Sequence, residues 1–197
     1  MLTQVMCKYL WYIWGDSIYL AMCKSIIVMT FNGEEKKEDV FMAIASFLHK
    51  ENLVIVSSDE SRPWGGFFVL AEKDAEKFIA RFFPQLSKED LAIAGKLSPK
   101  ILVVAPGKRL SWQYHHRRAE IWKLIAGRAA VATSDTNDEN HLDNLSIGDI
   151  VELKQGERHR LIGLDNWGVV AEIWQHTDSE NPSDEEDIVR LQDDFGR

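Results

Sequence analysis

The first regular element that the polarity pattern predicts is an amphipathic helix over residues 34–50. Charged residues open this segment, and the apolar positions after them recur three and four residues apart, the spacing that places side chains on one helical face. These positions are Val40, Phe41, Ile44, Ala45, Phe47 and Leu48. The run 53–56 predicts a strand, and the segments 75–83 and 88–94, separated by Pro84, predict two short helices.

From residue 100 onward the pattern changes to short strands and turns. In the segment 120–125 the side chains alternate with period two, which places Glu120, Trp122 and Leu124 on one face of a strand. Gly127 is expected to turn the chain after that strand. Close spacing of strands and turns is typical of a barrel, so the sequence predicts a mainly β fold preceded by helical additions.

The side chains in this region that could bind one metal ion are Gln113, His115, Glu120 and His159. Gln113 and His115 are two residues apart, so they project from the same face of an extended strand. A hairpin around residues 117–118 would bring Glu120 to that face, and a second hairpin within 150–162 would add His159. An amide oxygen, two imidazoles and a carboxylate together predict a divalent metal site.

The composition indicates one globular unit and excludes one class of partner. The chain has 197 residues with 45% hydrophobic content, which is enough for one core. Its formal net charge of −8 argues against nucleic acid as a partner, because that binding needs a basic face. Acids outnumber bases in the segment 178–197, which we interpret as a solvated surface.

Residues 1–28 are apolar and aromatic, but their pattern is unlike that of a membrane helix. Charged residues such as Lys8 and Lys24 interrupt them, so no apolar span reaches the roughly 20 residues that a bilayer requires, and no membrane partner is expected. Two interpretations stay open: a start assigned too far upstream, and a helix that packs against the barrel or a partner subunit. Both cysteines, Cys7 and Cys23, lie here without a disulfide framework, so a cytoplasmic location is expected.

Several separated motifs resemble one superfamily. Gln113, His115, Glu120 and His159, with the glycines around them, resemble the two motifs of the cupins, with Gln113 where most cupins carry the first histidine. Four further stretches resemble, more narrowly, the cupin domain of type II phosphomannose isomerases: residues 62–65, 106–113, 115–122 and 186–197. The resemblance implies a double-stranded β-helix, or jelly-roll barrel.

The resemblance also implies a domain organisation. Residues 1–28 form an uncertain apolar segment, and residues 29–59 form a helix and strand extension. Residues 60–197 form the cupin barrel, with a helical insertion at about 72–98. The chain departs from the family pattern at Arg117, which replaces a histidine, and at Ile121; neither is an expected ligand, so the departures bear on the sugar rather than on the metal.

The resemblance further implies a site and an activity. The four ligands would hold Zn²⁺, with Mn²⁺ or Fe²⁺ as other choices. Arg190 is expected as the catalytic pocket cation, and Lys100 and Arg118 as contacts to a phosphate. The implied function is an aldose–ketose isomerase that converts mannose 6-phosphate to fructose 6-phosphate, acting as a homodimer. No glycine-rich phosphate loop is visible, so guanylyltransferase activity is not expected.

Two other functions fit parts of this pattern. Two histidines and a carboxylate also form the iron site of Fe(II)-dependent dioxygenases. A cupin with altered loops could instead bind a sugar phosphate without catalysis. The sequence favours the isomerase because the flanking motifs resemble that family.

Overall fold

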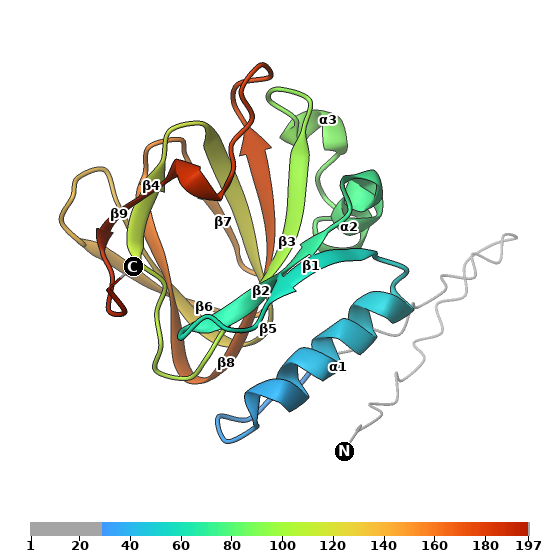
Figure 1. Cartoon of the computed structure of the whole chain (residues 1–197), viewed down its shortest axis with the longest axis vertical. Helices are drawn as coiled ribbons and strands as arrows, with labels where there is room; N and C mark the ends of the chain where they lie inside the picture. Colours follow the sequence, from blue (N-terminus) through green and yellow to red (C-terminus); the bar gives the residue numbers. More distant parts are fainter. Residues whose placement is uncertain (1–28, 197) are drawn as a thin grey trace, which may run out of the picture.

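The computed structural model describes residues 29–196, which fold into a barrel of antiparallel strands with helices on its outside (Figure 1). The nine described strands are β1 (Ile55–Asp59), β2 (Gly65–Leu70), β3 (Leu97–Val104), β4 (Trp112–His115), β5 (Arg118–Ser134), β6 (His141–Leu145), β7 (Ile150–Leu153), β8 (Arg158–His176) and β9 (Ile188–Gln192). The helical segments are α1 (Lys37–Lys50), α2 (Ala75–Phe82) and α3 (Lys88–Leu91), with 3-10 turns η1 (Glu72–Asp74) and η2 (Glu185–Asp187). The mainly β barrel expected from the sequence is confirmed, while the expectations for residues 1–28 lie outside the described residues.

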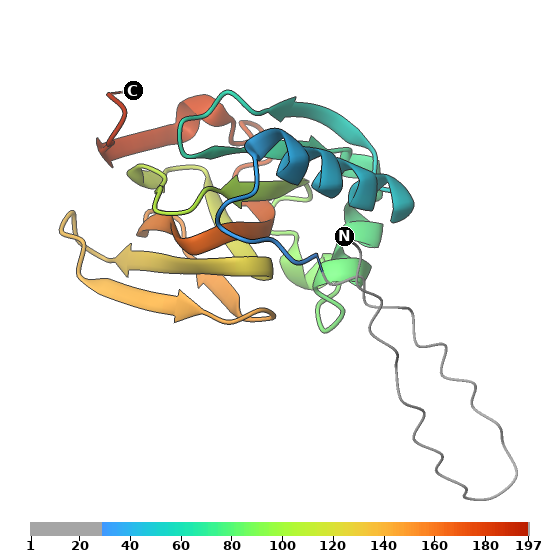
Figure 2. The ribbon, with the colours of Figure 1, turned by 90° about the horizontal axis from the view of Figure 1, so that it is seen from below.

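Helix α1 lies along the outer side of β1 and β2 (Figures 1 and 2). Its apolar face is buried as the periodicity predicted, and the ring of Phe41 packs 5.3 Å from that of Phe68 on β2. Gly66 permits this approach, since a Cβ atom there would lie 2.8 Å from the Phe41 ring. Within residues 29–196, no helix has both the length and the apolar character needed to cross a bilayer.

Three predicted boundaries shift in the structure. Helix α1 begins at Lys37 rather than at residue 34, because the charged residues before it form a turn. Strand β1 covers Ile55–Asp59 rather than 53–56. Helix α3 starts at a capping box, in which the Ser87 hydroxyl accepts from the Asp90 amide, and ends at Leu91 rather than at residue 94.

Strand β3 divides the molecule into two hydrophobic cores. Ile101 and Val103 project outward into the core formed with α1 and α2. Leu102 and Val104 project inward and pack with Trp122 and other residues inside the barrel. Successive side chains on a strand point to opposite faces, so one apolar strand supplies both cores. The helical insertion between β2 and β3 therefore covers the outside of the sheet and leaves its inner face to the site.

Both hairpins predicted around the candidate ligands are wrong. Strand β4 pairs with β8 and β9, whereas β5 pairs with β6, β7 and β8. The bend at residues 116–117 carries the chain across the barrel instead of folding it back, because both strands find partners far along the sequence. The predicted convergence still occurs, since Gln113 pairs with His159 in register.

Gly127 bends the long strand β5 rather than ending it, which corrects the turn expected there. Strand β5 continues to Ser134, with an irregular register between Gly127 and Ala129. Gly127 has a φ of 73°, and a Cβ atom on it would lie 1.7 Å from the carbonyl oxygen of Trp167. Only glycine fits this bend, because a side chain would suffer both backbone strain and a clash with β8.

We predict that Gly127→Ala lowers the free energy of unfolding more than Gly148→Ala does. Gly148 also has a positive φ, of 103°, but nothing lies within 4 Å of a Cβ atom placed there. The control therefore carries the conformational cost alone, about 1 kcal/mol. Urea denaturation should show a further loss of at least about 1 kcal/mol for Gly127→Ala. Equal losses for the two variants would contradict the close contact with Trp167.

Candidate metal centre

Three buried side chains from three strands meet inside the barrel. His115 ends β4, Glu120 lies on β5 and His159 lies on β8, and each is at most 2% exposed. The Nε2 atom of His115 lies 3.3 Å from His159 Nε2 and 3.1 Å from Glu120 Oε1, and His159 Nε2 lies 3.4 Å from Glu120 Oε2. Ligands bound at 2.0–2.1 Å around one tetrahedral ion are about 3.4 Å apart. The spacing of these donors therefore fits a single metal ion.

The protonation of the cluster also suits a cation. The Nδ1 atom of His159 lies 2.9 Å from the backbone carbonyl of Glu157, so Nδ1–H donates there and Nε2 keeps its lone pair for the centre. Burial lowers the pKa of His159 to about 4, so this imidazole is neutral at pH 7. Burial alone would raise the pKa of Glu120, but the neighbouring His115 and the guanidinium of Arg118 hold it well below its ordinary value.

One oxygen of this cluster has no protein partner. The buried Oε2 atom of Glu120 accepts no hydrogen bond from the described residues. An unpartnered buried carboxylate oxygen costs free energy, and a bound cation would compensate for that cost. His115, Glu120 and His159 therefore fit a divalent metal, as the sequence predicted.

Gln113 lies beside the cluster, on the register position opposite His159. It is 8% exposed, and its Oε1 atom accepts a hydrogen bond of 2.6 Å from the Ser111 hydroxyl. The amide oxygen is therefore already engaged by a neighbour. Its role as a fourth ligand stays a prediction.

Arg118 is buried behind the metal ligands. Its Nε atom donates to Glu120 Oε1 at 2.7 Å, and its Nη2 atom lies 3.1 Å from His115 Nε2. On its other side, Nη1 donates to the Ser183 hydroxyl at 2.8 Å and to the Asp184 carbonyl at 3.0 Å. The side chain is 1% exposed, so these contacts orient Glu120. Its expected role as a phosphate contact stays a prediction.

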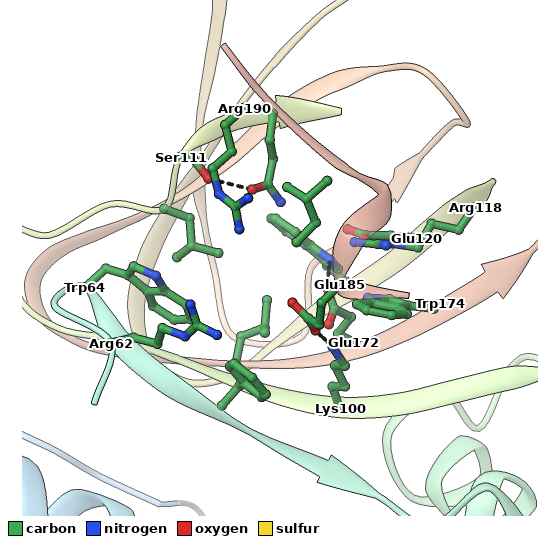
Figure 3. A pocket seen from close by; sticks show the side chains of 16 residues that line it. Arg62, Trp64, Lys100, Ser111, Arg118, Glu120, Glu172, Trp174, Glu185 and Arg190 are labelled. Carbon is green, nitrogen blue, oxygen red and sulfur yellow. Dashed lines mark hydrogen bonds and ion pairs between the residues drawn. The ribbon is translucent and has the colours of Figure 1, made fainter. Parts of the chain in front are cut away.

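A pocket opens beside these ligands, and charged side chains line it (Figure 3). Gln113, Arg118 and Glu120 belong to its lining. Cationic groups reach it from separate elements: Arg62 before β2, Lys100 on β3 and Arg190 on β9. The structure thus brings Arg190 and Lys100, both predicted from the sequence, to the same pocket as the candidate ligands.

Trp174 on β8 forms one wall of the pocket and is contacted by two cations. The Lys100 ammonium lies 3.4 Å from the ring centroid, and the Arg118 guanidinium carbon lies 3.6 Å from it. Cations are attracted to the negative face of an indole, most strongly where water is excluded. The Lys100 ammonium also pairs with Glu185 of η2, whose side chain is half exposed. Trp174 is itself only 6% exposed, so the wall that it forms is part of the buried interior.

Glu172 is a buried pocket carboxyl that the sequence did not reveal. It is 3% exposed, and its Oε1 atom accepts a hydrogen bond of 2.9 Å from Trp122 Nε1. Burial, followed by the nearby charge of Glu120, raises its pKa to about 8. The available signal was an acid inside the apolar run 168–174, where a charged residue is out of place.

Part of the acidic C-terminal segment is buried, which corrects the solvated surface predicted for it. Asp187 is 5% exposed and accepts hydrogen bonds from the backbone amides of His116 and Arg117, at 3.2 and 2.9 Å. The Arg117 guanidinium reaches Asp184 at 3.0 Å. The arginine that departs from the family pattern thus ties the bend at 116–117 to η2 and lies outside the three-residue cluster.

Much of the chain is similar to known proteins. Residues 72–193 match the family model described as "Mannose-6-phosphate isomerase C-terminal". The alginate biosynthesis protein AlgA of Pseudomonas aeruginosa is 32% identical over 58% of this chain and 22% of its own length. The mannose-1-phosphate guanylyltransferase ManC of Salmonella typhimurium is 35% identical over 50% of this chain and 19% of its own length. The chain thus spans about a fifth of these curated relatives.

Solved structures show weaker likeness. A mutant of the oxalate decarboxylase OxdC from Bacillus subtilis is 15% identical, with a TM-score of 0.49, and the match covers 68% of this chain and 30% of that one.

The relatives overturn the function expected from the sequence. Motifs within one domain predicted an aldose–ketose isomerase. The alternatives were a dioxygenase and a non-catalytic cupin. The curated relatives are named for alginate or xanthan biosynthesis and for mannose-1-phosphate guanylyltransferase, and this chain matches only a small part of each. The isomerase expectation for this chain is therefore wrong, because a shared domain does not carry the activity of a whole protein.

We predict that His159→Ala abolishes stable metal binding, whereas His116→Ala does not. His159 supplies a buried donor, while His116 is exposed and packs edge-on against Tyr114. Elemental analysis after dialysis should give roughly one ion per chain for the native protein and the His116 variant. Equal metal content in both histidine variants would refute the three-residue cluster.

We predict that Glu172 stabilises the metal-free protein at low pH and that this one contribution is lost as the pH rises from about 4.5 to about 8. In this range Glu172 stays protonated in the folded chain but ionises in the unfolded chain, so the native state binds more protons. The Glu172 contribution to the slope is at most about 1.4 kcal/mol per pH unit. Chemical denaturation at several pH values should show that the difference in free energy of unfolding between the native protein and Glu172→Gln changes across this range, since the lowered pKa values of His159 and His176 affect both proteins alike. Parallel profiles would disprove the raised pKa.

Proposed function

Because the chain belongs to the mannose-6-phosphate isomerase C-terminal family, we propose that it is a metal-dependent enzyme domain that binds a phosphorylated mannose. The family description and the guanylyltransferase relatives both name a phosphorylated mannose. The observation that carries the proposal is the pocket with four cationic side chains that reaches the three-residue cluster at Glu120. A sugar phosphate offers an anion for the cations and hydroxyl oxygens for a metal.

The metal in this proposal is Zn²⁺, held by His115, Glu120 and His159. Neutral imidazole and carboxylate donors suit this ion, which binds nitrogen and oxygen at about 2.0–2.2 Å. When bound, it would act as a Lewis acid on a sugar oxygen. Gln113 is proposed as a fourth ligand because it adjoins His159 on the neighbouring strand.

The phosphate is proposed to bind Lys100 and Arg190, with Arg62 beside them. Lys100 is 5% exposed, and its ammonium meets the half-exposed carboxylate of Glu185. An incoming phosphate offers Lys100 a stronger charge than one carboxylate does, so it would displace Glu185 from this pair. The Glu185 carboxylate thus marks the anion position of the pocket. The homodimer and the cytoplasmic location expected from the sequence stay predictions.

We predict that the zinc-loaded protein binds mannose 6-phosphate or mannose 1-phosphate more tightly than mannose, as measured by calorimetry. Lys100→Ala and Arg190→Ala should each weaken binding of the phosphorylated sugar by about tenfold or more, since each removes a charged contact. Metal content should not change in either variant. Lys154→Ala is the matched control, because Lys154 is exposed on the turn after β7. The proposal fails if the loaded protein binds neither phosphate, or binds them no better than mannose.

A further inference from the structure

We propose that Glu172 recognises one hydroxyl group of the sugar ring and so helps to determine which sugar phosphate the pocket accepts. This inference rests on the proposed function and assigns a role to a side chain that the metal and phosphate sites do not use. Glu172 lies on the pocket wall, is 3% exposed and comes from the C-terminal part of strand β8 (Figure 3).

The strand register gives Glu172 a fixed position. It lies directly opposite Lys100 on β3 and opposite Trp122 on β5. All three residues line the pocket, so they form one row of side chains across three adjacent strands. Two residues along these strands, on the same face, Glu120 lies opposite Trp174. Glu172 is therefore next to the proposed phosphate contact on one side and one row away from a metal ligand.

One oxygen of the carboxyl group is held by a hydrogen bond and the other has no hydrogen-bond partner among the described residues. Trp122 Nε1 donates to Oε1, which fixes the orientation of the group. The buried Oε2 atom has no hydrogen-bond partner among the described residues. A carboxyl with a purely structural role would have hydrogen bonds to both oxygens, because a buried oxygen without a hydrogen bond lowers the stability of the fold. Because Glu172 lines the pocket, a ligand bound there could supply the bond that this oxygen lacks.

The chemistry of the group favours a hydroxyl over a phosphate as its partner. In the metal-free protein the raised pKa favours a protonated carboxyl at neutral pH, which can both donate and accept a hydrogen bond, and an ionised carboxylate would still accept one from a hydroxyl. A sugar hydroxyl has the same two capabilities, whereas a phosphate only accepts and would repel the group once it ionised. In this arrangement Lys100 binds the phosphate of the ligand, and Glu172 binds a hydroxyl of its sugar ring.

The test measures binding by calorimetry on the zinc-loaded protein. It compares the loss of the Glu172 side chain with the loss of single hydroxyl groups from the ligand. The ligands are mannose 6-phosphate and its 2-deoxy, 3-deoxy and 4-deoxy analogues. In the native protein, one analogue should bind about tenfold or more weakly than the parent sugar, because one buried hydrogen bond is lost. In Glu172→Ala, the parent sugar should be weakened similarly, and that analogue should lose little further affinity.

Two controls keep the result interpretable. Glu172→Gln retains the shape and part of the hydrogen bonding, so it should keep part of the discrimination. Glu152→Ala alters an exposed acid on β7 and should behave as the native protein does. If the native protein binds mannose 6-phosphate but Glu172→Ala keeps the native ratios for all analogues, this inference alone is overturned. If the native protein binds no phosphorylated mannose, the proposed function is overturned with it.

Discussion

The contacts of Arg118 are the ones on which the rest of the site depends. Its guanidinium donates to Glu120 at one end and, at the other, to Ser183 and the carbonyl of Asp184. A charge removed from water is tolerated only where its donors meet partners in good geometry. The guanidinium therefore holds a metal ligand and the C-terminal segment in a single arrangement. Neither could move without leaving buried charge uncompensated.

That arrangement also determines the charge pattern of the pocket. Docking of residues 183–187 against the bend at 116–117 brings Glu185 to Lys100. The Trp174 ring then contacts both Lys100 and Arg118. Lys100 and Arg118 thus each have both an opposite charge and an aromatic face beside them. The Trp174 ring therefore lies between the Lys100–Glu185 pair and the Arg118–Glu120 pair, so the two cations stay close without contacting each other.

Local pattern was sufficient for some parts of the molecule and insufficient for others. The period of the segment 120–125 predicted that Glu120 faces inward, and motif spacing brought it to His115 and His159, as the structure confirms. The hairpins were wrong because β4 and β5 choose partners that are distant in sequence. Glu172 escaped notice because β8 is buried on both faces, so its apolar run has no alternation from which an inward acid could be recognised. Asp187 was hidden by the exposed acids around it.

The register of strand β3 determines both the packing of the two cores and the position of a pocket residue. Lys100 points into the pocket and Ile101 into the outer core, and β3 pairs with β2 on one side and β8 on the other. Sliding the strand by one residue would exchange these positions, placing an ammonium among the aromatic rings of α1 and α2 and an isoleucine in the pocket. Both cores would resist that error. The outer helices are not part of the pocket, but their packing against β3 disfavours the shifted register. They therefore help to select the register that places Lys100 in the pocket.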